Sequence, residues 1–272
     1  MSSAKASSKT SPVRAALANA KQRDGIALMP FLAAGYPDLR ATVESIRALE
    51  HAGATLIEVG FPFSDPIADG PIIQEAFTYA LAKNKVKVAD VFAAAQEARP
   101  SIPLVAMLSY SIVYRYGVER FARDARQHGF SGLILPDLPP PEAQKVCDVV
   151  SAQGLDNILL VAPTTSRDRR AEIANLCGGF VYYLSLSGIT GERDRLPDDL
   201  ERNVRELKSL TDVPVCVGFG IHRPEHVAQL KGVADGAIVG SAFVRRVKQH
   251  LNDGPEMIAR ITGDYCRELL GK

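Results

Sequence analysis

Short apolar runs bounded by turn residues recur along the chain at regular intervals, and they constrain its fold more than any other feature. Strands buried on both faces of a sheet show such continuous runs rather than an alternation of apolar and polar residues. The predicted strands are Ile26 to Ala33, Leu56 to Phe61, Pro103 to Leu108, Gly132 to Leu135, Ile158 to Ala162, Phe180 to Leu184, Val213 to Val217 and Gly236 to Val239.

Segments with helical periodicity lie between these runs, so strand and helix alternate eight times. The predicted helices are Leu39 to Ala52, Val88 to Arg99, Val118 to His128, Pro141 to Ala152, Arg167 to Leu176, Leu200 to Ser209, Pro224 to Leu230 and Ser241 to His250. Such alternation produces a parallel sheet, and eight regular units favour its closure into a single (β/α)8 TIM barrel. An open dinucleotide-binding sheet would carry GxGxxG after its first strand, and residues 33–37 do not supply it.

The barrel is expected to occupy residues 12–272, with an extra N-terminal helix, and residues 1–11 are expected to form a disordered tail rich in Ser, Lys and Ala. Two connections are long. Residues 62–87 follow the second strand and contain an additional predicted helix at 71–82, and residues 185–197 follow the sixth strand. Both leave the carboxyl ends of strands, where barrel enzymes build their active sites.

Composition narrows the class of partner. A formal net charge of +1 with 23% charged residues gives no electrostatic reason to expect nucleic acid or an acidic membrane. No apolar run is long enough to span a bilayer. The four cysteines are widely spread without a CxxC pair, which argues against a disulfide framework and favours a reducing cytoplasm. A small molecule or another protein is the expected partner.

Three carboxylates are candidates for acid/base chemistry. Glu58 lies inside an apolar strand, where an unpaired carboxylate costs several kcal/mol. Asp65 and Asp69 follow in the loop after that strand, so two carboxylates of different environment could face one cavity. The alternatives are a structural ion pair for Glu58 and a turn or helix-capping role for each aspartate. For Asp65, capping is nearly as well supported as function.

Glycine turns after the last two strands predict a phosphate site. Barrels commonly bind phosphate with the loops after strands seven and eight, through backbone N–H groups at a helix N-terminus. Gly220 and Gly240 stand in these loops, the Ser241 hydroxyl can donate, and Gly191 in the loop after strand six could add further amides.

Other barrel chemistries are disfavoured by what the predicted strands lack. None contains a lysine for a Schiff base, and no His, Asp or Glu cluster has metal-ligand spacing, so no metal is expected. His222 is the only histidine close behind a strand, and a capping or surface role suits it better. Phe31 and Tyr182 are apolar enough to be plain core residues, although a strand-end aromatic would also pack against a flat ring.

The segment from Glu58 to Gln74, EVGFPFSDPIADGPIIQ, resembles the signature of the tryptophan synthase alpha subunit family. Further matches follow in chain order: Pro30 to Phe31, Gly35 to Asp38, Asp137 to Pro139, Tyr182 with Ser187 to Gly191, Gly218 to Ile221, and Gly240 to Ser241. The resemblance covers nearly the whole chain. It implies a (β/α) barrel that cleaves indole-3-glycerol phosphate to indole and glyceraldehyde 3-phosphate, without a metal or organic cofactor of its own.

The resemblance also implies roles for single residues. Glu58 resembles the general acid/base and Asp69 the carboxylate that accepts the indole N–H. Phe31 and Ile73 would line the indole pocket, Tyr182 would lie near Glu58, and Thr190 would close over the site. The phosphate would fall to Gly191, Gly220, Gly240 and Ser241. Residues 186–200 would form a lid, in which Leu186 stands where many relatives have a basic residue.

The family pairs with a beta subunit in an allosteric alpha2beta2 heterotetramer, and the beta subunit carries pyridoxal phosphate and consumes the indole to make tryptophan. By resemblance, Pro62, Asp65 and the segment Ser109 to Tyr116 would contact it. Three alternatives stay open on sequence alone: a free-standing indole-3-glycerol-phosphate lyase, a non-catalytic regulatory subunit, and another phosphate-binding barrel such as an isomerase. The last two are disfavoured by Glu58 and Asp69 and by the long signature.

Overall fold

The computed structural model describes residues 11–66, 69–185, 196–218 and 220–272. Its strands form one parallel sheet in the order β5-β4-β3-β2-β1-β9-β8-β7-β6. The strands are β1 (Ala27–Ala33), β2 (Ile57–Gly60), β3 (Leu104–Met107), β4 (Phe130–Ile134), β5 (Asp156–Ile158), β6 (Leu160–Val161), β7 (Val181–Leu184), β8 (Val215–Gly218) and β9 (Gly236–Val239).

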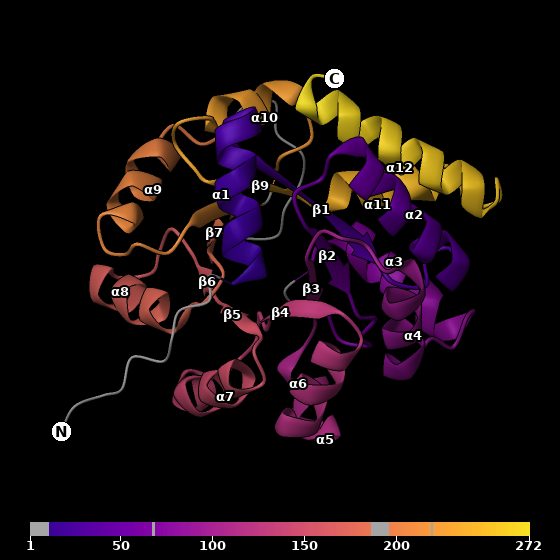
Figure 1. The fold of residues 1–272 in the computed structure, drawn as a ribbon, viewed down its shortest axis with the longest axis horizontal. Helices are drawn as coiled ribbons and strands as arrows, with labels where there is room; N and C mark the ends of the chain where they lie inside the picture. Colours follow the sequence, from indigo (N-terminus) through magenta and orange to yellow (C-terminus); the bar gives the residue numbers. More distant parts are fainter. Residues whose placement is uncertain (1–10, 67–68, 186–195, 219) are drawn as a thin grey trace.

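The sheet closes through its fifth predicted strand, which is interrupted at Leu159. One half of that strand, β5, pairs with β4, and the other half, β6, pairs with β7. The ring of eight strands is therefore complete in topology, and the predicted barrel is confirmed (Figure 1).

The described helices surround this barrel, except that the first lies across its amino end. They are α1 (Pro12–Asp24), α2 (Leu39–Ala52), α3 (Pro71–Ala82), α4 (Val88–Ala98), α5 (Tyr110–Tyr116), α6 (Val118–Gln127), α7 (Pro140–Ala152), α8 (Arg167–Leu176), α9 (Leu200–Lys208), α10 (Pro224–Leu230), α11 (Ser241–Gln249) and α12 (Pro255–Leu270). The extra helix after the second strand has the predicted bounds. The sequence pattern does not predict helices α5 and α12. Helix α12 packs against α2, the helix that follows β1. None of these helices is long and apolar enough to cross a membrane.

Apolar side chains form two layers, one inside the barrel and one between the sheet and the helices. Alternate residues of each strand serve the two layers, because successive strand side chains point to opposite faces. On β2, Ile57 and Val59 pack outward against the helices, so Glu58 points into the barrel. There it is level with Phe31 of β1 and Val105 of β3, both members of the inner layer.

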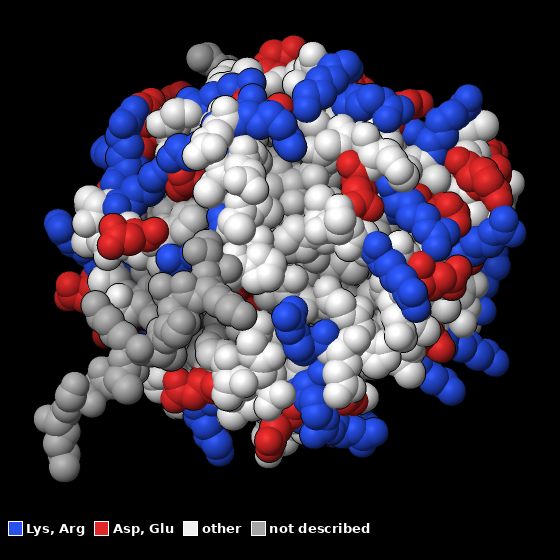
Figure 2. All heavy atoms as spheres, viewed as in Figure 1, with Lys and Arg blue, Asp and Glu red and all other residues white. Residues whose placement is uncertain are grey.

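Helix α1 closes the amino end of the barrel, opposite the expected active face. Its buried residues Val13, Leu17 and Ala20 belong to the inner layer. Lys21 reaches Asp235, immediately before β9, at 3.0 Å. Figure 1 shows α1 lying across the strands, and on this same face Figure 2 shows acidic and basic side chains interspersed around the rim.

We expect Leu17→Ala to destabilise the fold by about 2–4 kcal/mol, because Leu17 is only 2% exposed and its removal leaves a cavity under α1. Urea denaturation followed by circular dichroism measures this. The matched control is Gln22→Ala on the exposed face of the same helix, which should change stability by less than about 0.5 kcal/mol. Equal effects of the two substitutions would contradict the sealing role of α1.

Candidate active site

A cavity of about 360 Å³ opens at the carboxyl ends of the strands, a size typical of small-molecule sites. Eight of the residues singled out from the sequence line it: Phe31, Glu58, Asp69, Ile73, Tyr182, Gly220, Gly240 and Ser241. Closure of the barrel is what brings these distant residues together. Thr190, Gly191 and Leu186 lie outside the described residues.

Glu58 forms the floor of the cavity and is 1% exposed. Within the described part of the chain, its Oε1 has no hydrogen-bond partner and no basic side chain forms an ion pair with it. Burial without a compensating charge raises the pKa of this carboxyl from 4.5 to about 8. The geometry does not support the alternative of a structural ion pair, and at neutral pH the group carries a proton that it can donate.

Asp69 is held at the cavity wall by the loop after β2. Its backbone N–H donates to the Pro66 carbonyl at 3.0 Å, and Gln74 Nε2 donates to the Asp69 carbonyl at 2.8 Å. The capping position of α3 is taken by Gly70, which makes no side-chain capping bond, so the Asp69 carboxylate faces the cavity instead. Burial, and then the negative charge of Asp137, raise the pKa of Asp69 to about 6.

Tyr182 completes the group of ionisable side chains at the floor. Burial raises its pKa well above 10, and the carboxylates of Glu58 and Asp69 act in the same direction. Its ring lies against Gly218 of β8 so closely that any Cβ there would overlap it. The tyrosine hydroxyl thus remains protonated over the range in which the two carboxyls titrate.

Phe31 and Ile73 supply an apolar wall. Phe31 packs over Gly60, where a Cβ would stand 2.6 Å from its Cε2 atom, so only glycine at residue 60 allows this ring position. Gly240 lies beside both side chains, with its ideal Cβ position 3.7 Å from Phe31 Cβ and 4.0 Å from Ile73 Cδ1. A flat ring placed here would have Asp69 at its edge.

The loops after β8 and β9 supply a second stretch of the cavity wall, next to the apolar one. Gly240 caps the N-terminus of α11, and Ser241 is the first residue of that helix. Gly220 follows β8 with a left-handed backbone (φ +80°), and its carbonyl contacts His222 Nδ1 at 2.8 Å. A helix N-terminus with free N–H groups attracts anions, so this side suits a phosphate.

Sequence reasoning missed two cations at the mouth of the cavity. Arg245 and Lys248 line it together with Glu75, and Lys248 Nζ lies 2.6 Å from the Glu75 carboxylate. The two cations follow Ser241 by four and seven residues on α11, a spacing that places all three on one helix face. That spacing could have identified them once Ser241 was placed at a helix start.

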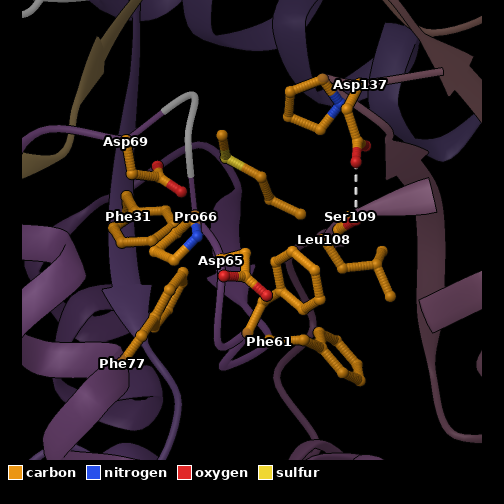
Figure 3. Close-up of a pocket in the computed structure, with 12 residues that line it drawn as sticks. Phe31, Phe61, Asp65, Pro66, Asp69, Phe77, Leu108, Ser109 and Asp137 are labelled. Carbon is orange, nitrogen blue, oxygen red and sulfur yellow. Dashed lines mark hydrogen bonds between the residues drawn. The ribbon is translucent and has the colours of Figure 1, made fainter. Parts of the chain in front are cut away.

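A second cavity shares Phe31, Asp69 and Met107 with the first and extends toward α5 (Figure 3). Aromatic and aliphatic side chains form most of its wall, and Asp65, Asp137 and Ser109 are polar residues on it. Asp65 is exposed and accepts a hydrogen bond from its neighbour Ser64 at 3.0 Å. Pro62 lies half-buried between the two phenylalanines of the same loop, Phe61 and Phe63. The described residues include no group of three His, Cys, Asp or Glu that could hold a metal ion.

Comparison with known proteins gives consistent matches over nearly the whole chain. The sequence model described as "Tryptophan synthase alpha chain" matches residues 17–269. The alpha chain of Rhodopirellula baltica is 43% identical over 270 residues, which cover 95% of this chain and 97% of that one. The alpha chain of Synechocystis sp. is 43% identical over 252 residues, which cover 92% and 94%.

Two solved structures are also similar. Tryptophan synthase from M. tuberculosis in an aminoacrylate-bound form superposes with a TM-score of 0.82 at 35% identity, covering 95% of this chain and 99% of that one. A mutant tryptophan synthase alpha-subunit from Pyrococcus furiosus gives a TM-score of 0.83 at 37% identity, covering 92% and 99%.

We expect Glu58→Gln to be more stabilising at pH 8 than at pH 5. A carboxyl whose pKa rises from 4.5 to about 8 on folding retains its proton only in the folded state between these values. Its contribution to stability is complete below pH 4.5 and is lost as the pH rises through 8, by several kcal/mol over that window. The neutral amide has no such dependence. Urea unfolding of both proteins at the two pH values measures the difference, and a constant difference would contradict the raised pKa.

Proposed function

This chain belongs to the tryptophan synthase alpha chain family, and from that membership we propose that it is a carbon–carbon lyase. Its substrate is indole-3-glycerol phosphate, and the products are indole and glyceraldehyde 3-phosphate. The observation that carries the assignment to this site is the pairing of Glu58 and Asp69, with pKa values raised to about 8 and about 6, across one cavity.

Substrate binding divides the cavity in two. The phosphate lies against the start of α11, at the amides of Gly220, Gly240 and Ser241, and by family resemblance Thr190 and Gly191 complete this side. The indole ring lies against Phe31 and Ile73, with its N–H directed to the Asp69 carboxylate. Arg245 and Lys248 at the mouth offset the negative charge of the phosphate.

Glu58 begins the reaction as an acid. Because its pKa is about 8, it is protonated at neutral pH and delivers that proton to C3 of the indole ring. The ring becomes a cation, which the ionised Asp69 stabilises at the nitrogen. The bond between C3 and the glycerol chain then breaks, its electrons return to the ring, and the Glu58 carboxylate takes the hydroxyl proton as the aldehyde forms. One proton leaves Glu58 and one returns, so no cofactor is consumed.

The partner is a tryptophan synthase beta chain in an alpha2beta2 assembly, and by resemblance that chain holds the pyridoxal phosphate. Asp65, Pro62 and helix α5 form the docking face. Within α5, Tyr114 is 69% exposed, unusual for so large an apolar side chain. The four cysteines are free thiols, which supports a reducing compartment such as the cytoplasm.

Release of glyceraldehyde 3-phosphate from indole-3-glycerol phosphate tests the function directly. We expect weak cleavage by the purified chain and a strong increase on addition of the beta chain. Glu58→Gln should lose a factor of about 10²–10⁴ in kcat while substrate binding survives, and Asp69→Asn should lose about 10²–10³. Strong activity indifferent to the beta chain would identify a free-standing lyase, and no activity in either case would refute the proposed reaction.

The pH profile of kcat/KM tests the order of proton transfer. With Glu58 protonated and Asp69 ionised in the active form, the rate should rise through about pH 6 and fall through about pH 8. The substrate phosphate also titrates near pH 6, so the basic limb is the diagnostic one. A rate that increases through pH 8 would show that Glu58 begins as a base.

A further inference from the structure

Asp137 lies on the wall of the second cavity without a role in the reaction proposed above. It enters from the loop between β4 and α7, whereas Asp69 enters from the loop after β2, and both residues line the same cavity, with the Asp137 carboxylate directed at Ser109 (Figure 3). Phe31, Phe61 and Phe77 form much of the wall around them. Asp137 is itself exposed, so solvent screens part of the repulsion between its carboxylate and that of Asp69.

The Asp137 carboxylate is bonded to the first turn of α5. Ser109 Oγ donates to one of its oxygens at 2.6 Å, and the Tyr110 backbone N–H donates to the other at 2.7 Å. Ser109 is also the N-cap of α5, where its hydroxyl accepts from the Ser111 N–H at 3.2 Å. Both oxygens of Asp137 are therefore fixed by the start of one short helix. No ion pair joins Asp137 to a basic side chain in the part of the chain that the structure describes.

Helix α5 is exposed on its outer side. The rings of Tyr110 and Tyr114 pack on each other with centroids 5.9 Å apart, and Tyr114 points largely into solvent. A partner that covers this tyrosine pair contacts the same seven-residue helix whose first turn holds Asp137. A small shift of α5 would consequently move the Asp137 carboxylate relative to Asp69.

We propose that Asp137 is a positioning residue that couples the placement of helix α5, and hence partner docking, to the electrostatic environment of Asp69. This inference rests on the proposed function, in which Asp69 stabilises the ring cation and the beta chain docks at α5. Docking that draws Asp137 away from Asp69 relieves the repulsion between them, so Asp69 is ionised over a wider pH range. The cleavage step then accelerates below about pH 6, where Asp69 of the free chain is partly protonated.

After burial, the negative charge of Asp137 is the second cause that raises the pKa of Asp69. Other ionisable groups also face Asp69 across the two cavities and stay constant in the comparison below. They are Glu58, Asp65, Glu75, Tyr182, Arg245 and Lys248.

Asp137→Asn tests the proposal because the amide keeps the shape and an acceptor oxygen but removes the charge. We expect the acid limb of the kcat/KM profile to move to lower pH by roughly half a unit to one unit, as loss of a like charge requires. The substrate phosphate titrates identically with both enzymes, so the difference reports the protein. At pH 5, where Asp69 of the free chain is mostly protonated, stimulation of cleavage by the beta chain should fall several-fold.

Ser109→Ala separates the effect of the Asp137 charge from that of its hydrogen bonds to α5. It retains the Asp137 charge but removes one of its two donors, so the acid limb should stay in place while stimulation by the beta chain falls. Asp148→Asn is the matched control, because it removes the same charge from an exposed position on α7 and should change neither quantity.

Carbon-13 NMR of aspartate carboxyls, with the Asp69 signal assigned through Asp69→Asn, gives a readout that needs no substrate. A lower Asp69 pKa in Asp137→Asn supports the coupling even if the chain proves inactive, in which case only the proposed reaction fails. An unchanged Asp69 titration together with wild-type stimulation by the beta chain would overturn the inference. If Asp137→Asn lowers stimulation by the beta chain without changing the Asp69 pKa, Asp137 only caps α5, and the inference is likewise overturned.

Discussion

Parallel closure of the sheet is the constraint on which the site depends. Because all strands run in one direction, their carboxyl ends lie on one circle, and the loops that follow them face a common space. Glu58 in β2, Tyr182 in β7 and Ser241 after β9 are far apart in sequence, yet they line a single cavity. The amino end is filled instead by α1, whose apolar face completes the inner layer. The amino end of the barrel thus contributes to stability, and the carboxyl end carries the candidate active site.

Two aromatic rings inside the barrel each pack against a glycine on the neighbouring strand. Phe31 lies over Gly60, and the Tyr182 ring lies over Gly218, with no room for a Cβ in either place. Close packing of this kind fixes the rings at the positions where they border the cavity. The same glycines keep the backbone close to the ring without adding a polar group. Gly60, two residues after Glu58, is therefore required by the space that the Phe31 ring occupies rather than by the reaction.

The barrel and much of its site could be predicted from sequence because the signals are local. Each strand is a continuous apolar run, and Glu58 is conspicuous as a charge inside one of them. The break at Leu159 was not predictable, since the apolar run continues through it and the interruption depends on pairing with two different neighbours. Helix α12 does show apolar residues at helical spacing, but it follows the eighth unit, where the repeating pattern gives no reason to expect another helix.

Contacts between loops were beyond sequence reasoning for a different reason. The sequence marks Asp137 only as part of a family motif, because nothing near residue 137 indicates bonds to Ser109 and Tyr110 on another unit. Arg245 and Lys248 read as ordinary charges of a solvated helix face until the start of α11 is placed at the cavity. Such residues acquire a role only from the register and closure of the barrel. The roles of Thr190 and Gly191 rest on family resemblance alone.

The two central carboxyls differ in how they can be regulated. Glu58 is enclosed within a strand, and its raised pKa comes from burial. Asp69 sits on a loop that borders both cavities, and part of its shift comes from a charge carried by a different loop. Moving a loop costs a partner much less free energy than moving a packed sheet. Control by docking is therefore expected to act through the anion that stabilises the ring cation, while the proton donor at the floor keeps the same pKa in the free and the assembled enzyme.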